Sequence, residues 1–455
     1  MSAKGSSEEL RELGNEAFKK GQVDDALNFY LQALHADPTS PLPFLNSAVC
    51  HLKMQNWEQV TEMCNEALSR DGTLLKAYYR RGLARMQLGE LRMAITDLKM
   101  ASKDGDMEAK KKLLECQKAY RAEIFMQAIR KSTLELTLAS IQAIEVDSTY
   151  AGPKIDDQVG VSPDFCRALM HYFSQTESRP LLPLRYVLQI LYEVLQVFKK
   201  QATLVRIEKL SCLTVCGDTH GQYQDVMTIF ELNGVPSQDT VYCFNGDIVD
   251  RGPMSIELFL VLCAWKIALP SSFYINRGNH EDPSVNRFHG LFKELEMKYS
   301  DKASDLHSLF GQVMQWMPLA HLYQDNLILH GGIPRPDLTL SEIESIERGT
   351  SQKPGSLSSQ ILWSDPNHKS GINPSHRGEG VLFGPDITSS FLKLNGLKRL
   401  IRSHVWEPTG WKEEHNGQCI TIFSAPNYIP GNPSPAAYMH ILPDDTVEFC
   451  QFNQK

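Results

Sequence analysis

Three short motifs in the second half of the chain bring carboxylate, imidazole and amide side chains together at regular intervals. The motifs are Gly217-Asp218-Thr219-His220-Gly221, Gly246-Asp247-Ile248-Val249-Asp250-Arg251-Gly252 and Arg277-Gly278-Asn279-His280-Glu281. Asp218 and Asp247 are 29 residues apart, and Asp247 and Asn279 are 32 residues apart. Two later histidines stand in His330-Gly331-Gly332 and Arg402-Ser403-His404. Together these segments offer six candidate metal ligands, none of them a cysteine: Asp218, His220, Asp247, Asn279, His330 and His404.

Donors of this mixed oxygen and nitrogen kind suit manganese, iron or zinc. Six donors are too many for one tetrahedral ion, so we expect two adjacent ions that share a bridging carboxylate. Two ions about 3.5–4 Å apart lower the pKa of a bound water and hold both ends of an in-line displacement at phosphorus. A single Gly-Asp-x-His-Gly is more often a plain loop, and a single histidine is more often a core or surface residue. The combination of the three motifs at this spacing is far more specific than any one of them.

Each motif comes directly after a short apolar run that predicts a β-strand. The runs cover residues 213–216, 241–245, 272–276, 326–329, 397–401 and 419–423, and the last leads into Ser424-Ala425-Pro426-Asn427-Tyr428. Polar side chains beyond the carboxyl ends of strands face a shared crevice in layered α/β folds. Helical patterns separate the first three motifs, which is typical of βαβ units. The sequence therefore predicts an α/β domain with its site at the strand ends, and amphipathic helices within residues 163–200.

The first hundred residues repeat with a period of 34. Small residues recur at this spacing, as in Ala33, Ala67 and Ala101, and a second column holds Gly21, Gln55 and Gly89. A 34-residue helix–turn–helix unit resembles the tetratricopeptide repeat. We expect three repeats in residues 1–115, a capping helix and linker in 116–160, and the α/β domain in 161–455.

Five polar residues of the repeats are spaced so that they could meet in one groove. Residues four apart share a helix face, and three cations with two amides suit the carboxylate at a peptide's C-terminus. The set resembles the carboxylate clamp of tetratricopeptide domains that bind the C-termini of heat-shock protein 90 chaperones: Arg11, Asn15, Asn46, Lys76 and Arg80. Arg11 departs from that resemblance, because such clamps usually have lysine there. Solvated surface charge is the simpler interpretation of any one of these residues.

Composition excludes several classes of function. The chain has 455 residues and a formal net charge of −8, which does not favour nucleic acid as a partner. The longest apolar run, 258–265, is far shorter than the roughly 20 residues of a membrane span. The first residues have no apolar core typical of a signal peptide. Ten scattered cysteines without a Cys-x-x-Cys pair predict reduced thiols, and hence the cytoplasm, with the nucleus as a second compartment.

The first three motifs resemble those of the calcineurin-like metallophosphoesterases. Later segments narrow the resemblance, over about residues 185–450, to serine/threonine protein phosphatases of the phosphoprotein phosphatase family: Leu362-Trp363-Ser364-Asp365-Pro366, Arg377-Gly378, Phe383-Gly384-Pro385-Asp386, Arg402-Ser403-His404 and Ser424-Ala425-Pro426-Asn427-Tyr428. The resemblance implies a β-sandwich of mixed sheets flanked by helices. It assigns one ion to Asp218, His220 and Asp247, and the other to Asp247, Asn279, His330 and His404. Manganese is the ion expected in purified protein, with iron and zinc as alternatives.

Histidine 280 is the best candidate general acid, because it is next to a ligand and is not needed for metal. Asp250 would accept its hydrogen bond and favour the protonated imidazole. Phosphate oxygens would be bound by Arg251, Asn279, Arg377 and Tyr428, whereas Arg277 and Arg402 are expected to hold loops.

The resemblance also implies autoinhibition, in which the repeats cover the catalytic cleft until a chaperone or a fatty acid releases them. Gln55 stands where relatives have an acidic residue that helps this closure, so we expect higher basal activity here. The family usually has cysteine where this chain has Ile429, and a proline-rich segment follows, which leaves toxin sensitivity open.

Two other functions compete with this prediction. One is a scaffold with an inactive phosphatase domain, which the presence of all six ligands and His280 disfavours. The other is a metallophosphoesterase of nucleic acids or dinucleotides, which the acidic balance and the later motifs disfavour.

Overall fold

The structure is a computed structural model of the whole chain, and it describes residues 6–131, 137–175, 181–208, 212–429 and 433–454. The chain divides into two compact units. One comprises residues 1–133 with His376–Gly378, and the other comprises residues 134–375 and 379–455. The predicted boundaries after residues 115 and 160 stay predictions.

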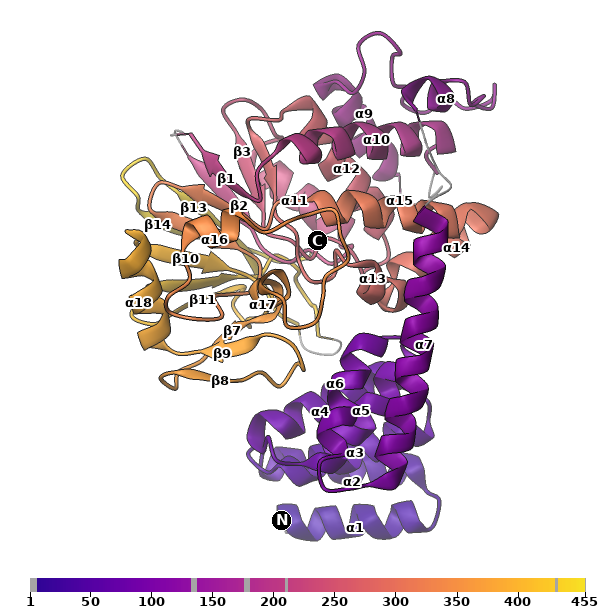
Figure 1. Cartoon of the computed structure of the whole chain (residues 1–455), viewed down its shortest axis with the longest axis vertical. Helices are drawn as coiled ribbons and strands as arrows, with labels where there is room; N and C mark the ends of the chain where they lie inside the picture. The colour runs from indigo at the N-terminus through magenta and orange to yellow at the C-terminus, as the bar shows by residue number, and fades with distance from the viewer. Residues whose placement is uncertain (1–5, 132–136, 176–180, 209–211, 430–432, 455) are drawn as a thin grey trace. The chain divides into compact units, whose positions relative to one another are not determined.

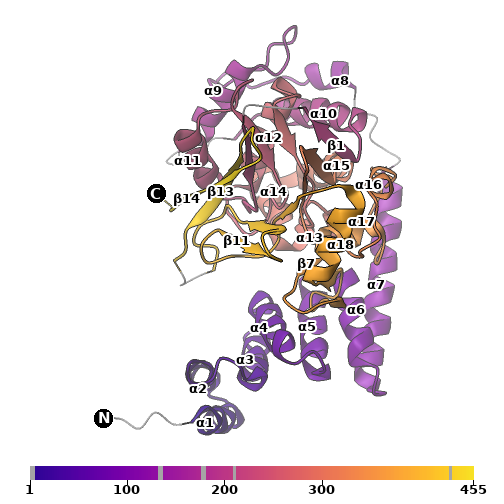
Figure 2. The ribbon, with the colours of Figure 1, turned by 90° about the vertical axis from the view of Figure 1, so that its left-hand side faces the viewer.

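The first unit is a series of antiparallel helix pairs (Figure 1). They are α1 (Ser7–Lys19), α2 (Val23–Ala36), α3 (Pro41–Lys53), α4 (Trp57–Arg70), α5 (Leu75–Gln87) and α6 (Leu91–Ala101), followed by the long α7 (Met107–Lys131). Figure 2 shows α1 and α2 nearly end-on, side by side. Small residues permit the close pairing: a Cβ on Gly14 would lie 2.5 Å from the Tyr30 ring, and one on Gly82 would lie 2.9 Å from Leu98. The predicted helical repeats are confirmed.

The second unit holds two large mixed sheets. In the five-stranded sheet, β2 (Leu213–Cys216), β3 (Val241–Phe244) and β4 (Phe273–Ile275) are parallel, and β13 (Ala436–Ile441) and β14 (Val447–Phe452) complete the order β14-β13-β2-β3-β4. The six-stranded sheet has the order β1-β5-β6-β10-β12-β11. Its strands are β1 (Leu204–Ile207), β5 (Ala320–Tyr323), β6 (Asn326–Leu329), β10 (Arg399–Arg402), β11 (Trp411–Glu414) and β12 (Cys419–Ile422). A small sheet joins β7 (Asp365–Pro366), β8 (Ile372–Pro374) and β9 (Val381–Phe383).

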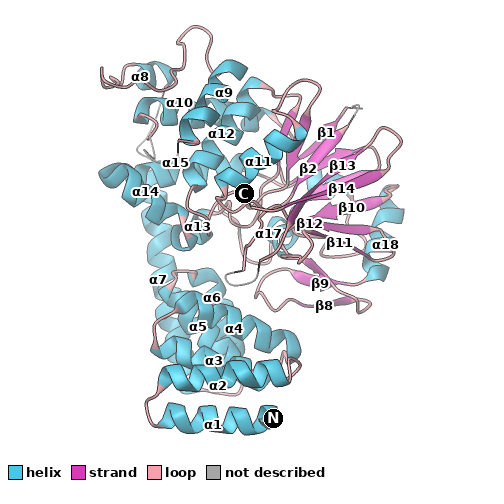
Figure 3. Cartoon of the chain, turned by 180° about the vertical axis from the view of Figure 1, so that it is seen from behind, coloured by secondary structure: helices cyan, strands magenta, loops and turns pink. Residues whose placement is uncertain are grey.

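Helices cover the outer faces of the two large sheets. Figure 3 shows several helices on one side of the strands and α18 (Pro385–Asn395) on the other. The first group includes α9 (Pro163–Phe173), α10 (Leu184–Lys200), α11 (Tyr223–Asn233), α12 (Ser255–Ala268), α14 (Leu291–Tyr299) and α15 (Ala303–Trp316). The shorter helices are α8 (Leu138–Gln142), α13 (Pro283–His289), α16 (Leu340–Glu344) and α17 (Leu357–Trp363), and a 3-10 turn spans Ser300–Lys302.

Three apolar clusters fill the spaces between the helices and the two large sheets. One lies between the first group of helices and the five-stranded sheet, where Trp265 and Phe244 are buried. A second fills the space between the two sheets, as with Val215 and Ile401. The third lies between the six-stranded sheet and α18, as with Leu400 and Phe391. The predicted β-sandwich flanked by helices is therefore confirmed.

The six predicted strands are present with ends within one residue of the prediction, except that the fifth begins two residues later than predicted. That strand begins at Arg399 instead of Leu397 because Leu397 still donates its N–H to Leu392 of α18, where Gly396 ends the helix in the left-handed conformation. All ten cysteines carry free thiols. Among the described residues, no helix combines the length and the apolar character that a membrane crossing requires. Residues 430–432 of the proline-rich segment and 132–136 of the predicted linker lie outside the described residues.

Candidate functional site

The six predicted ligands follow the ends of β2, β3, β4, β6 and β10, and the structure brings them together. His220 Nε2 lies 3.7 Å from one carboxylate oxygen of Asp218 and 3.7 Å from one of Asp247. His330 Nε2 lies 3.4 Å from Asp247 and 3.2 Å from His404 Nδ1. All of these side chains are buried. The strand ends therefore form one compact cluster, as the sequence predicts.

This cluster consists of atoms that accept hydrogen bonds. His330 Nδ1 is 2.9 Å from the Asn245 carbonyl and donates to it, so its Nε2 carries a lone pair. The polar end of the Asn279 amide is surrounded by acceptors: it lies 2.8 Å from that Nε2, 2.9 Å from His404 Nδ1, and 3.0 and 3.1 Å from the Asp247 oxygens. Oxygen and nitrogen lone pairs at such distances repel one another unless a cation lies between them. The donor set therefore fits metal ions.

Asp247 belongs to two groups of candidate ligands. It groups with His220 and His280, and also with His330 and His404, and in each group the ligand atoms lie within 4.8 Å of one another. A carboxylate shared by two groups is what a bridging ligand requires. The structure places His280 in the first group, where the sequence placed Asp218, and Asp218 lies beside it. The division of the six residues between two ions stays a prediction.

Electrostatics of the cluster favour neutralisation by cations. Burial, with the charge of Asp247, raises the pKa of Asp218 to about 7. Burial lowers the pKa of His330, and burial followed by His280 lowers that of His220. Both imidazoles are therefore held in the neutral form that binds metals.

His280 and Asp250 form a hydrogen-bonded pair next to the ligands. Their Nδ1 and Oδ2 atoms are 2.7 Å apart, and both side chains are buried. The other oxygen of Asp250 accepts the Leu291 N–H at 3.0 Å, and the Asp250 N–H donates to Ser255 Oγ at 3.0 Å. With Nδ1 bonded to Asp250, Nε2 is the ring nitrogen that can pass a proton.

Several of these residues have backbone angles that L-residues rarely adopt. The φ values are +41° at His220, +49° at Asp247, +73° at Asp250, +67° at Arg251 and +71° at His404. Such conformations cost about 1–3 kcal/mol each and persist only where surrounding contacts hold them. Their concentration at the cluster is typical of a functional site.

The predicted phosphate-binding residues differ in their position relative to the cluster of candidate ligands. Arg251 is exposed and follows Asp250 directly. The Tyr428 ring stacks on His220, with centroids 5.1 Å apart. Arg377 lies in the loop between β8 and β9, within the segment His376–Gly378 that groups with the first unit, so the structure does not assign it to the cluster. Contact with phosphate stays a prediction for all of them, Asn279 included.

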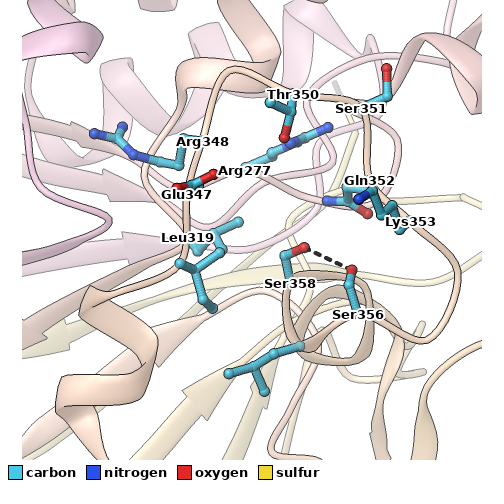
Figure 4. A pocket seen from close by; sticks show the side chains of 12 residues that line it. Arg277, Leu319, Glu347, Arg348, Thr350, Ser351, Gln352, Lys353, Ser356 and Ser358 are labelled. Atoms are coloured by element: carbon cyan, nitrogen blue, oxygen red, sulfur yellow. Dashed lines mark hydrogen bonds between the residues drawn. The ribbon is translucent and has the colours of Figure 1, made fainter.

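Arg277 and Arg402 hold loops, as expected. Arg402 donates to the Gly331 carbonyl at 2.7 Å and to Asp365 at 2.7 Å. Arg277 donates to the Glu281 carbonyl at 3.0 Å and to Asp282 at 3.1 Å. Arg277 also lines a pocket of about 220 Å³ with residues that include Arg348, Lys353, Ser356 and Ser358 (Figure 4). None of the six ligands lines this pocket, so it is separate from the cluster.

Two supporting residues received no role from the sequence. Asn245 donates from Nδ2 to the Leu329 carbonyl and to Ser403 Oγ, both at 2.9 Å, and so joins the loops that carry His330 and His404. Glu281 accepts hydrogen bonds from the loops of Asp247 and Asn279. A polar residue that directly follows a buried apolar strand was the available signal for Asn245, whereas the only signal for Glu281 was its place directly after Asn279 and His280.

In the repeats, three of the five clamp residues, Asn15, Asn46 and Arg80, lie close together. Asn15 Oδ1 accepts from Asn46 Nδ2 at 3.0 Å and from the Tyr30 hydroxyl at 2.9 Å. Arg80 donates to the carbonyl of Leu45, next to Asn46, at 2.7 Å. Burial raises the pKa of Tyr30 to about 12, and the positive charges of Arg11 and Arg80 partly oppose this shift. Lys76 is exposed one turn before Arg80, and Arg11 is also paired with Glu8 and Glu12.

The layered fold and its acceptor cluster define a metallophosphoesterase. Residues 213–408 match the family described as calcineurin-like phosphoesterase, and residues 113–206 match a family described as PPP5 TPR repeat region. A solved protein serine/threonine phosphatase from Saccharomyces cerevisiae, described as similar to human phosphatase PP5, aligns with a TM-score of 0.60 at 33% identity, over 64% of this chain and 96% of its own.

Two curated relatives match along almost the whole chain. Serine/threonine-protein phosphatase 5 of Homo sapiens is 35% identical over 98% of this chain and 90% of its own length. Serine/threonine-protein phosphatase T of Aspergillus oryzae is 35% identical over 97% of this chain and 93% of its own. The chain therefore belongs to the serine/threonine-protein phosphatase 5 family, and it is a metal-dependent phosphatase.

Proposed function

We propose that the protein hydrolyses phosphoserine and phosphothreonine monoesters on other proteins, with His280 as the general acid. The observation that carries this proposal is the His280–Asp250 pair beside the acceptor cluster. A general acid must lie within hydrogen-bond reach of the leaving oxygen, and this imidazole is in the same group of side chains as Asp247 and His220.

Metal ions would be held by Asp218, His220 and Asp247 on one side, and by Asp247, Asn279, His330 and His404 on the other. When bound, two such ions lower the pKa of a water molecule and stabilise negative charge on the phosphate. Manganese is the ion we expect in purified protein, with iron or zinc as the alternatives.

The residues of the chain orient the ester and supply the proton. Arg251 and Arg377 would bind phosphate oxygens through their guanidinium groups, whose paired N–H donors match the geometry of an oxyanion. Asn279 and the Tyr428 hydroxyl would add hydrogen bonds. His280 Nε2 would give its proton to the serine or threonine oxygen as the P–O bond breaks, and Asp250 would stabilise the protonated ring.

The reaction class is tested by comparing two substrates. We expect the purified protein to release phosphate from a phosphoserine peptide much faster than it cleaves the diester bis-(p-nitrophenyl) phosphate. Preference for the diester would favour a nuclease-like activity instead. Protein that binds metal but cleaves neither compound would favour the scaffold.

We further propose that the repeats bind the acidic C-terminal peptide of heat-shock protein 90 chaperones. The supporting contacts join Asn15 to Asn46 and to the Tyr30 hydroxyl, and join Arg80 to the Leu45 carbonyl next to Asn46. Amidation of the peptide's terminal carboxyl removes the group that the clamp would bind. Equal affinity for the free and the amidated peptide by calorimetry would contradict the clamp.

Autoinhibition by the repeats and release by a chaperone peptide or a fatty acid are also part of the proposal, with the cytoplasm and nucleus as compartments. The test compares the full chain with residues 134–455 on a small phosphoester. The shortened chain should begin near 134 because Ile155 is buried in the core of the second unit and the Tyr150 ring packs on Tyr172. We expect a modest gain in kcat because Gln55 lacks a charge. A very large gain would contradict weak inhibition.

A further inference from the structure

The carboxylate of Glu281 accepts backbone hydrogen bonds from two different loops. Its Oε2 accepts from the N–H of Asp247 at 2.7 Å and from that of Gly278 at 2.8 Å. Its Oε1 accepts from Ile248 at 2.9 Å and from Val249 at 3.3 Å. The side chain has no exposed surface. The two carboxylate oxygens of Glu281 therefore join the two loops through these four amides.

These loops carry the groups on which the proposed reaction depends. The first, after β3, holds Asp247 and Asp250, and the second, after β4, holds Asn279 and His280. They are in direct contact, because a Cβ on Gly278 would lie 2.3 Å from the Asp247 nitrogen and 2.7 Å from Glu281 Oε2. The His280 N–H also donates to Asp247 Oδ1 at 2.9 Å. A small change in the spacing of these loops would change the spacing of the ligands.

The first loop needs such external support. Asp247 and Asp250 have φ values of +49° and +73°, in the left-handed region. The amides that Glu281 binds are those of Asp247, Ile248 and Val249, directly before Asp250. Successive N–H groups that converge on one point form a site for an anion, and here the anion is a side chain of the neighbouring loop.

We propose that Glu281 is a positioning residue, which sets the distance between the Asp247 loop and the Asn279–His280 loop and so creates the metal site. It acts through the backbone of both loops and not by contact with the ions or the phosphate. Its effect on turnover rests on the proposed function. Its effect on metal affinity can be measured without turnover.

Two substitutions separate positioning from a simple effect of charge. Glu281→Gln keeps the size but replaces one acceptor oxygen by an NH₂ group, which would face backbone N–H donors. Glu281→Asp keeps the charge and both acceptors but is one methylene too short to reach both loops. Glu342→Gln is the matched control. Glu342 also accepts a backbone N–H, from Thr339 at 2.9 Å, and a bond from Arg335, and both partners lie outside the ligand loops.

The experiment titrates the chelator-treated full-length chain with Mn²⁺ and follows free Mn²⁺ by electron paramagnetic resonance. We expect Glu281→Gln to weaken binding about 10- to 100-fold, the usual effect of residues that orient metal ligands. Glu281→Asp should weaken it at least several-fold, and Glu342→Gln should match wild type. Hydrogen exchange at the amides of Asp247, Ile248 and Gly278 should be faster in both Glu281 variants. Excess Mn²⁺ should partly restore kcat of Glu281→Gln on a phosphoserine peptide.

Wild-type Mn²⁺ affinity in Glu281→Asp would overturn the proposal. It would show that a negative charge at this position supports metal binding even when the side chain is too short to bond to both loops. If Glu281→Gln does not fold, the shorter variant decides the question alone. A wild-type protein that binds Mn²⁺ but leaves phosphoserine intact would refute the proposed function, and the affinities of the two variants would still decide the role of Glu281.

Discussion

Hydrogen bonds through Asp250 fix the orientation of the His280 ring. Its Nδ1 is 2.7 Å from Asp250, whose second oxygen accepts the Leu291 N–H. The bond to Asp250 occupies Nδ1, so Nε2 is the ring nitrogen of His280 that remains for chemistry beside Asp247 and His220. Donation of a proton from Nε2 is what this arrangement permits.

Replacement of His280 by alanine should therefore separate metal binding from proton transfer. We expect His280→Ala to retain both ions and to lose at least about 10²-fold in kcat, the usual effect of removing a general acid. The measurement is metal content by elemental analysis together with kcat on a phosphoserine peptide. An unchanged kcat would show that another group supplies the proton.

Lys266 is a buried lysine in α12. Its Nζ donates hydrogen bonds to the carbonyls of Pro270 and Phe273, each at 2.8 Å. Burial lowers its pKa to about 7. Between that value and the pKa of about 10.4 in the unfolded chain, the unfolded chain binds more protons, so this group makes stability rise with pH.

We expect the unfolding free energy of wild type, relative to Lys266→Met, to increase between pH 7 and pH 9 by up to about 1.4 kcal/mol per pH unit. Chemical denaturation at several pH values measures this difference. The exposed Lys293, changed to methionine, serves as the control for the loss of a lysine. A flat difference for Lys266→Met would contradict the prediction.

At the scale of elements, the helical turns that follow α1, α3 and α5 have one conformation in common. Gly21 and Gly89 have φ values of +82° and +70°, and Gln55, at the same place in the second repeat, has +61°. Glycine adopts this region without cost, whereas other residues lose about 1–2 kcal/mol there. The second repeat therefore carries a strain that its neighbours avoid.

We expect Gln55→Gly to stabilise the repeat unit by about 1 kcal/mol, because the relief of strain exceeds the entropy that glycine adds to the unfolded chain. Thermal unfolding of the full chain, followed by circular dichroism, measures the change. Gly21→Ala is the reverse control and should destabilise. No rise in the melting temperature of Gln55→Gly would contradict this view of the turn.

The sequence predicted these elements well where the signal is local. Apolar runs followed by Gly-Asp or Arg-Gly-Asn mark β2, β3 and β4, and the 34-residue columns mark the helices. It could not predict Glu281 as a link, because three of the four amides that it binds lie 32 to 34 residues away in another loop. It also gave no sign that Asp247 and Asp250 would adopt left-handed angles, since these depend on contacts that form only in the folded chain.

At the scale of the whole molecule, two units with separate cores share one chain. The repeats pack around residues such as Leu68 and Ala48, and the α/β unit packs around its three clusters. Recognition of a chaperone peptide and hydrolysis of a phosphoester would thus be assigned to different units. Because the predicted carboxylate clamp and the predicted metal site share no residue, substitutions can remove either site and leave the residues of the other unchanged.

The central claim is that six side chains from five strand ends hold two cations that hydrolysis requires. The most direct measurement follows Mn²⁺ bound per chain and turnover of a phosphoserine peptide together, as chelator-treated protein is refilled with Mn²⁺. We predict no turnover without metal and full turnover as occupancy approaches two ions per chain, with both lost in Asp247→Ala. Turnover by metal-free protein, or a chain that binds no Mn²⁺ at these residues, would contradict the claim.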